Sequence, residues 1–545
     1  MLWTRCVVLL SVTALFCSEG ASRQAAVPQS FTISGTVVEH GSNHPLKNTV
    51  VTIVAVAQEG AHASCRTGED GRFTFTQLAA GKYQIHARLR GFPPQALAED
   101  ENYSTAIAAG PGLDSGNIVF PLFAGGSIRG TVLDEETEPI RQARVWLFRK
   151  GVFSGASHIS LQGQQTTDSS GRFRFPYLKI GTYFVAVQAQ PWYSQNNFTP
   201  PPSGAGQTNP NSEFDVSYPL TYYAGTADLA SASALAVTEG SSKDVQITLR
   251  PVPSVHVHIS GIPAESRNAF VPTFSQITFG GFQVPGFGGA FTGENQFELF
   301  GIAPGRYLVS ASRQGRHPSE QFAPQVLDLT TNATIDLGAQ ASSSLGGRIT
   351  FNGLAGPPSQ ASVALQRADG QGGLMISAAT DGSLNLTRGA LLPGRYQLRL
   401  VNAPDFYLKS IGAKGAAVSA GELEIPDAAS VQLSLVAARG VTSINGTAMK
   451  DDKPFAGAMV LLIPKNFART DFIRRDQSDS DGTFTLPNVP VGEYVLLAID
   501  DGRELAYCEP AAMKPYLSGG TVITTPVPKG SAVTVNVLPR QPGSN

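Results

Sequence analysis

The sequence contains few charged residues, few methionines and few cysteines. Asp, Glu, Lys and Arg make up 15% of its 545 residues, below the roughly 25% of an average soluble domain. The net charge is −2 and no basic run occurs, so we expect no nucleic-acid partner. After residue 20 no stretch is long and apolar enough to cross a bilayer as a helix. We therefore expect no transmembrane segment in the mature chain.

Signatures of common enzymes are missing as well. The sequence has no Gly-x-Ser-x-Gly elbow, no P-loop and no dinucleotide-binding fingerprint. His317-Pro318-Ser319-Glu320 matches half of a zinc carboxypeptidase pattern, but no histidine follows His317 to complete the site. His256 and His258 alternate on a predicted strand with no acidic residue or cysteine close in sequence, which favours an exposed strand face over a metal pair. We predict no catalytic residues, no cofactor and no metal.

The chain instead repeats one pattern five times: a polar turn, then Phe or Leu, then Gly-x-Tyr. The Phe or Leu positions are Phe73, Phe173, Phe297, Leu384 and Phe484, and the tyrosines are Tyr83, Tyr183, Tyr307, Tyr396 and Tyr494. In four copies the Tyr follows the Phe by 10 residues. Turns such as Asp-Gly before alternating apolar residues are typical of strands. We expect the tyrosine rings to pack in a core, where each hydroxyl needs a partner.

Short strands with turns between them, and no helical periodicity, predict an all-β fold. Repeats spaced by about 100 residues are large enough to bury their own cores. We predict a signal peptide followed by a tandem array of about five Ig-like β-sandwich modules, in a string with short linkers. The predicted segments are 1–20 (signal peptide), 28–123 (module 1), 124–250 (module 2, with an aromatic insertion at 190–226), 251–339 (module 3, divergent), 340–438 (module 4) and 439–540 (module 5).

The motifs resemble those of the carboxypeptidase regulatory-like domain. Ile33-Ser34-Gly35-Thr36-Val37 and Ile128-Arg129-Gly130-Thr131-Val132 open modules 1 and 2, and Asp-Gly-x-Phe and Gly-x-Tyr units follow. The resemblance covers nearly the whole mature chain and is most specific in modules 1, 2 and 5. It implies a prealbumin-like sandwich, related to Cna-B-type and carbohydrate-binding-like folds, and a non-catalytic module found beside peptidases and transporters. The arrangement is similar to multi-module envelope proteins of acidobacteria.

The N-terminus predicts export. Arg5, the apolar run from Cys6 to Phe16 and the small residues before Ala21 are typical of a secretory signal peptide. We expect a secreted, extracellular or cell-envelope protein, with a periplasmic location as an alternative. Cys17 follows the bulky Phe16, where a lipoprotein cleavage site needs a small residue, so we expect no lipidation at Cys17.

Two cysteines remain after the predicted signal peptide. Cys65 lies in module 1 and Cys508 in module 5. A disulfide between them requires the array to fold back on itself. We therefore predict two free thiols.

The insertion in module 2 is the best candidate binding segment, because long loops on rigid sandwiches often carry function. Aromatic faces beside amide groups suit sugar rings and their hydroxyls. The candidate ligand-binding residues are Trp192, Tyr193, Asn196, Asn197, Tyr222 and Tyr223. We expect a non-catalytic protein that binds polysaccharide, another cell-envelope component or other envelope proteins. The alternatives are a structural stalk, which would bury these aromatics between modules, and an accessory protein of a peptidase system.

Overall fold

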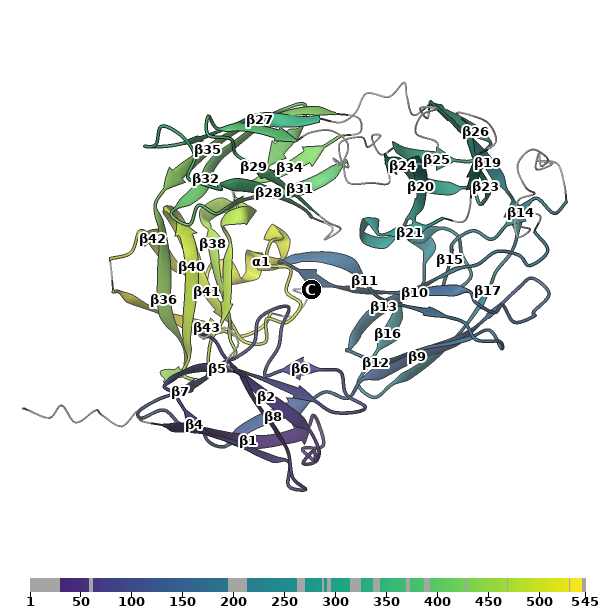
Figure 1. The fold of residues 1–545 in the computed structure, drawn as a ribbon. Helices are drawn as coiled ribbons and strands as arrows, with labels where there is room; N and C mark the ends of the chain where they lie inside the picture. The colour runs from purple at the N-terminus through teal and green to yellow at the C-terminus, as the bar shows by residue number, and fades with distance from the viewer. Residues whose placement is uncertain are drawn as a thin grey trace, which may run out of the picture.

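The computed structural model describes residues 30–57, 62–194, 213–261, 270–286, 289–291, 296–313, 325–336, 344–368, 373–386, 393–426, 429–467, 469–528 and 530–541. These residues form an all-β array of sandwich modules, as predicted (Figure 1). The one α-helix among them is α1 (Pro510–Leu517). None of the helices in these ranges has the length and hydropathy of a membrane span. The predicted signal peptide lies outside the described residues.

Modules 1 and 2 have matching pairs of sheets. In module 1 the sheets are β4-β1-β8 (Arg72–Leu78, Phe31–Glu39, Ile118–Leu122) and β3-β2-β5-β6 (His62–Arg66, Val50–Ala55, Gly81–Arg88, Gln95–Ala96), with β7 (Ile107–Ala109) on β5. In module 2 they are β12-β9-β17 (Arg172–Leu178, Gly126–Leu133, Ser242–Thr248) and β11-β10-β13-β15 (Ala156–Thr166, Arg144–Phe153, Gly181–Gln188, Thr221–Tyr222), with β16 (Leu235–Val237) on β13. Both sheets of each module contribute to a single hydrophobic core.

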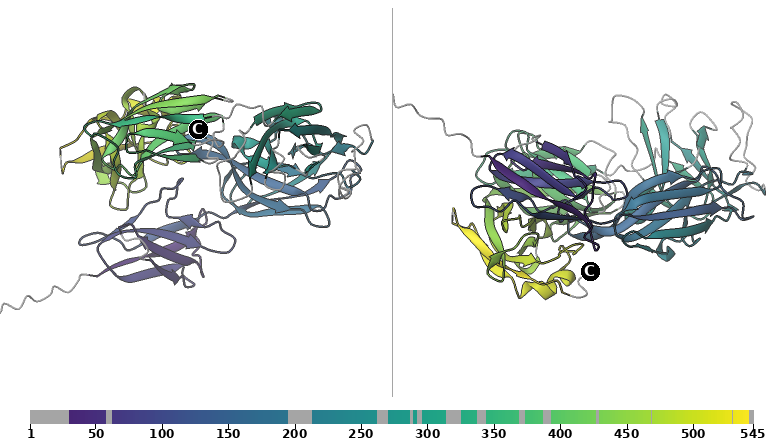
Figure 2. Two further views of the ribbon diagram at one scale, coloured as in Figure 1. Left: turned by 45° about the horizontal axis from the view of Figure 1, so that its top comes forward. Right: turned by 90° about the horizontal axis from the view of Figure 1, so that it is seen from below.

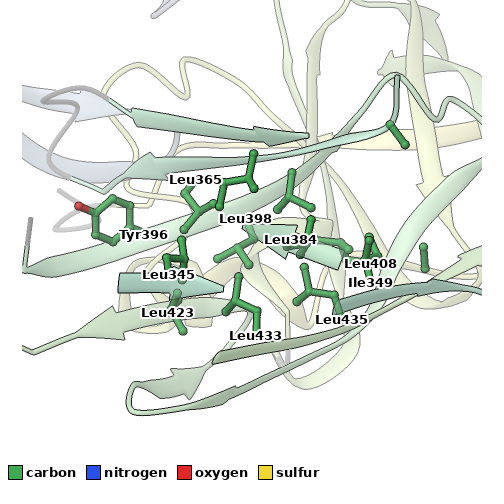
Figure 3. Packing of buried hydrophobic residues seen from close by; sticks show 14 of the residues in the cluster. Leu345, Ile349, Leu365, Leu384, Tyr396, Leu398, Leu408, Leu423, Leu433 and Leu435 are labelled. Carbon is green, nitrogen blue, oxygen red and sulfur yellow. The ribbon is translucent and has the colours of Figure 1, made fainter. Parts of the chain in front are cut away.

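Modules 3 and 4 repeat this arrangement. The sheets of module 3 are β22-β23-β19-β26 (Gly289–Phe291, Phe297–Ile302, Val255–Ser260, Ala333–Asp336) and β21-β20-β24-β25 (Gln283–Pro285, Phe270–Ile277, Gly305–Arg313, Gln325–Leu329). Those of module 4 are β30-β27-β35-β32 (Ser383–Leu386, Ser344–Phe351, Ser430–Arg439, Phe406–Lys414) and β29-β28-β31-β34-β33 (Gly373–Ser377, Ser362–Arg367, Gly394–Val401, Glu422–Ile425, Ala417–Ser419). Figure 3 shows Leu365 and Leu398 of one sheet packed against Leu433 of the other.

Module 5 forms one continuous eight-stranded sheet. Its order is β37-β36-β43-β41-β38-β39 (Lys453–Pro454, Val441–Lys450, Ala532–Leu538, Gly492–Ile499, Met459–Pro464, Arg474–Gln477), with β40 (Thr483–Pro490) on β36 and β42 (Thr521–Thr525) on β41. Every residue of β38 is buried. One face of β38 lies in the sandwich core, and the other packs under Met513 and Tyr516 of α1.

The first strand of every module pairs in parallel with its last long strand. The pairs are β1 with β8, β9 with β17, β19 with β26, β27 with β35, and β36 with β43. This pairing explains the recurring glycine of the first strand. A Cβ at Gly35 would lie 2.2 Å from the Ile118 carbonyl oxygen, and one at Gly130 would lie 2.4 Å from that of Val245. The motif therefore contains glycine because the last strand passes too close for a side chain.

The repeated tyrosines are buried, as the spacing predicts. In four modules the hydroxyl donates a hydrogen bond to the carbonyl four residues earlier: Tyr83 to Ala79 (2.9 Å), Tyr183 to Lys179 (2.7 Å), Tyr307 to Ala303 (2.6 Å) and Tyr494 to Pro490 (2.9 Å). The bond fixes the turn before the strand, as in the tyrosine corner of other sandwiches. Tyr396 of module 4 is buried as well.

Removing one of these hydroxyls should weaken its module. We expect Tyr183→Phe to lower the local unfolding free energy by about 1 kcal/mol, because the Lys179 carbonyl loses its internal donor. Tyr177→Phe is the matched control, since Tyr177 is an exposed tyrosine of the same module. Hydrogen exchange of the β13 amides measures the difference. Equal exchange in both variants would show that the hydroxyl bond adds nothing.

The modules do not form the extended string that we predicted. Figures 1 and 2 show the array turning back, so that module 1, in purple, lies beside module 5, in yellow-green. Hydrogen bonds and ion pairs join residues of module 5 to residues nearly 400 positions earlier, such as Asp479 to Lys82. The sequence pattern describes single modules, and a string was the simplest arrangement of them. The residues that join the ends are single side chains with no repeat signature.

Candidate functional site

The exposed aromatic residues of the insertion lie directly after β13. Trp192 has 79% of its surface exposed, and its ring stands edge-on to that of Tyr193 with centroids 5.7 Å apart. Tyr193 is half-buried. The structure therefore presents Trp192 to solvent, as we expected for a residue that contacts a ligand.

Glu135 of module 2 anchors this loop. Its carboxylate accepts hydrogen bonds from the hydroxyls of Tyr193 and of Tyr218, the latter at 2.7 Å. Partial burial opposes ionisation, but the two phenol hydrogen bonds hold the pKa of Glu135 below its usual value. Burial and the carboxylate raise the pKa of both tyrosines. The loop is therefore fixed by an ionised carboxylate and two protonated phenols.

The other candidate residues are placed differently. Asn196 and Asn197 lie outside the described residues. Tyr222 is only 2% exposed, and burial raises its pKa to about 12. Tyr223 is half-buried against the core of module 2. The structure thus corrects the candidate set: Tyr222 is an internal packing residue, because its ring lies between modules 2 and 3 and not on the surface.

The contact between modules 2 and 3 is a second hydrophobic core. Phe279 of module 3 inserts among three rings of module 2, with centroid distances of 5.2 Å to Phe148, 4.7 Å to Phe184 and 5.3 Å to Tyr222. The Tyr222 hydroxyl shares a 2.8 Å hydrogen bond with Thr278. The Gly- and Phe-rich stretch that makes module 3 divergent in sequence thus begins at a docking segment, and its aromatic richness was the available signal.

A buried charge cluster also joins these modules. His256 of β19 is 2% exposed and lies between two carboxylates: Nε2 is 2.8 Å from Asp215, in the insertion, and Nδ1 is 2.8 Å from Glu298 of β23. Burial opposes protonation, but the two hydrogen bonds raise the pKa of His256 above its usual value. Our expectation of an exposed histidine face is correct for His258 alone. Asp215 is distant in sequence, so local spacing could not reveal the cluster.

Modules 1, 2 and 5 meet at Arg475. Its guanidinium contacts the carboxylates of Asp100 and Glu101 in module 1, with its carbon 4.5 Å from the ring centroid of Tyr103 and 5.4 Å from that of Tyr507. Glu101 also accepts a 2.8 Å hydrogen bond from the Ser154 amide of module 2. These ionic side chains are almost fully buried, so one arginine links three modules.

Neutral hydrogen bonds extend this junction. The Gln477 amide donates to the Ala98 carbonyl at 2.6 Å and to the Thr105 hydroxyl at 2.9 Å, joining modules 5 and 1. The Cys508 amide donates to the Gly155 carbonyl of module 2 at 2.8 Å. Cys508 and Cys65 are free thiols, as predicted, although the array folds back.

The described residues contain no group of three His, Cys, Asp or Glu side chains arranged to hold a metal ion. His317-Pro318-Ser319-Glu320 lies outside the described ranges. The buried clusters at His256 and Arg475 pair each cation with two carboxylates, so their charges are used within the fold. What this part of the chain offers for function is an aromatic surface loop and the spaces between modules.

Residues 32–108 and 127–250 match the model of the carboxypeptidase regulatory-like domain. These segments lie in modules 1 and 2, where the motifs are most specific. For modules 3 to 5 the resemblance stays a prediction. Comparison with curated proteins gives no match.

Three solved bacterial structures illustrate the similarity in fold. The minor pilin GBS52 of Streptococcus agalactiae is 13% identical, with 41% of this chain and 96% of that chain covered and a TM-score of 0.21. The Bacillus anthracis TIE protein is 12% identical, with 76% and 75% covered and a TM-score of 0.18. The shaft pilin of Lactobacillus rhamnosus GG is 11% identical, with 41% and 98% covered and a TM-score of 0.20. Similarity at this level says nothing about what the present chain binds.

Proposed function

We propose that this chain is a non-catalytic, secreted or envelope-associated protein that binds polysaccharide through the loop at Trp192. The observation that carries the proposal is the 79% exposure of Trp192. Large exposed aromatic rings are uncommon on soluble proteins unless they contact a partner. A flat indole ring stacks on the C–H face of a sugar, and neighbouring polar groups bind its hydroxyls.

The anchoring of the loop supports the same proposal. Glu135 fixes Tyr193, and Tyr193 stands against Trp192, so the indole is presented by a restrained neighbour. A preformed surface loses less conformational entropy when it binds. A stalk would bury these aromatics at a module contact. The structure does so with Tyr222 but not with Trp192, which favours the binding function over the stalk.

Export and absence of catalysis belong to the same proposal. The signal-like N-terminus predicts passage across a membrane. The match of residues 32–108 and 127–250 to a regulatory-like domain supports a non-catalytic role. The partners that fit are polysaccharides or other components of a cell envelope.

Tryptophan fluorescence tests the proposal directly. Trp3 lies in the predicted signal peptide, so Trp146→Phe leaves Trp192 as the single tryptophan of the mature protein. We expect saturable quenching of this variant by at least one member of a polysaccharide array. In the wild-type background, Trp192→Ala should weaken binding by about tenfold or more and change stability by less than about 0.5 kcal/mol.

Tyr177→Ala serves as the matched control, since Tyr177 is another exposed aromatic of module 2. Binding should be unchanged in this variant. No quenching by any glycan, or equal loss of binding in both alanine variants, would overturn the proposed function and leave protein assembly as the better explanation.

A further inference from the structure

A cavity of about 840 Å³ lies where modules 1, 4 and 5 meet. Its walls come from residues 101–103 of module 1, residues 397–408 of module 4 and residues 470–475 of module 5, with smaller contributions from Ser154 and Tyr507. The volume is within the range of ligand-binding sites, roughly 300–1,000 Å³. The cavity exists because the array folds back, and it is distinct from the loop at Trp192.

The cavity wall carries positive charge that no carboxylate offsets. Arg399 of β31 has no hydrogen-bond or ion-pair partner among the described residues. The guanidinium of Arg474 donates only to main-chain carbonyls, those of Asn488 (2.7 and 3.1 Å), Asp471 (2.9 Å) and Ile473 (3.0 Å).

The carboxylates of the wall are already engaged. Glu101 contacts Arg475, and Asp471 contacts Arg469. Neither of them is paired with Arg399 or Arg474 in the part of the chain that the structure describes. Two guanidinium groups are thus left facing the cavity without an acidic partner.

These two arginines are close enough to repel each other. Burial lowers the pKa of Arg474, and the positive charge of Arg399 lowers it further. An anion bound between them would relieve this repulsion. Arginine is the residue that binds planar carboxylates with paired, charge-assisted hydrogen bonds. The electrostatics of the cavity therefore favour a carboxylate ligand.

The rest of the wall suits a sugar ring. Tyr407 and Phe472 stand edge-on with ring centroids 5.6 Å apart, and Tyr103 completes the aromatic part of the lining. Side-chain amides of Asn102 and Asn488 also line the cavity. Rings of this kind stack on C–H faces, and amides both donate to and accept from hydroxyls.

We propose that this cavity binds an acidic oligosaccharide, one whose sugars carry carboxylate groups. Arg399 and Arg474 hold the carboxylate, the aromatic rings contact the sugar faces, and the amides bind hydroxyls. The site goes beyond the loop at Trp192, and each site can exist without the other.

Isothermal titration calorimetry with a galacturonic acid tetramer tests this proposal on the full-length mature protein. We expect saturable binding that weakens as salt concentration rises, and no binding of the neutral galactose tetramer. Arg399→Gln should weaken binding at least tenfold, because one charged hydrogen-bonding partner is lost. The fold should tolerate this change, since Arg399 is exposed and makes no ion pair with the described residues.

Arg395→Gln is the matched control, because Arg395 is an exposed arginine of the same strand that lies outside the cavity wall. It should bind the acidic tetramer like the wild type, and so should Trp192→Ala. The proposal is overturned if the acidic tetramer does not bind, if Arg399→Gln binds as well as Arg395→Gln, or if Trp192→Ala alone abolishes binding. The last result would place the glycan at the surface loop, so failure of this inference is distinguishable from failure of the proposed function.

Discussion

Arg475→Ala is expected to lower the free energy of unfolding by about 3–5 kcal/mol, because it leaves the buried carboxylates of Asp100 and Glu101 without a cation. The same change should release module 5 from module 1, since Arg475 links the two. Chemical denaturation measures the first effect, and small-angle X-ray scattering measures the second as an increase in the radius of gyration.

Lys465→Ala is the matched control for this prediction. Lys465 also forms an ion pair in module 5, with Glu493, but both side chains are more than half exposed. Pairs of this kind contribute about 0–1 kcal/mol. Equal effects of the two substitutions would contradict the role given to the buried cluster.

A neutral version of the cluster separates charge from packing. In the variant Arg475→Met, Asp100→Asn, Glu101→Gln no unpaired charge remains buried. We expect most of the lost stability to return, because replacing all members of a buried ionic cluster is often close to neutral. If this variant is as unstable as Arg475→Ala, the loss comes from packing against Tyr103 and Tyr507.

His256→Ala is expected to destabilise the contact between modules 2 and 3 by about 3–5 kcal/mol, since Asp215 and Glu298 would remain buried with no cation between them. Hydrogen exchange of the β19 amides measures the local opening free energy. His258→Ala is the matched control on the same strand. His258 is exposed, so its loss should change stability by less than about 0.5 kcal/mol. Equal effects of the two changes would remove His256 from the account.

The wild-type contact should also depend on pH. The hydrogen bonds to Glu298 and Asp215 raise the folded-state pKa of His256 above the unfolded value of 6.5. The stabilisation is therefore fully present below pH 6.5 and is lost as pH rises through the folded-state pKa. The β19 amides should lose protection over that interval in the wild type but not in His256→Gln. Protection that is constant, or that increases with pH, would contradict the protonated bridge.

The sandwich fold could be predicted because its signals are local. The turn, the alternating strand and the buried Tyr183 lie within about a dozen residues of one another, and the same spacing recurs in other modules. The glycine of the first strand is also readable as a motif. Only the structure shows that its cause is the last strand, with Ile118 passing close to Gly35.

The contacts between modules could not be predicted in this way. The pairing of Arg475 with Asp100 joins single side chains 375 positions apart, and no repeat or spacing marks such a contact. The available signal was weak: in a chain with little charge, two adjacent arginines occur where a strand is expected. Tyr222 shows the same limit, because a loop aromatic that docks between modules has the same sequence pattern as one that binds a ligand.

The helix α1 was missed for a different reason. It is eight residues long and contains Pro515, so it carries little helical periodicity. It forms because Met513 and Tyr516 cover the second face of β38 in module 5. Tertiary packing supplies most of the stability of such short helices, and sequence reasoning on local propensity does not include it.

The folded-back array is the central claim, because the junction at Arg475 and the cavity at Arg399 both depend on it. Small-angle X-ray scattering of the mature protein tests it most directly. A compact chain of this length has a radius of gyration of about 24 Å, whereas five such modules in a straight string give about 50 Å. We predict a value below about 35 Å that increases in Arg475→Ala. A value near that of the string, unchanged by Arg475→Ala, would contradict the closed arrangement.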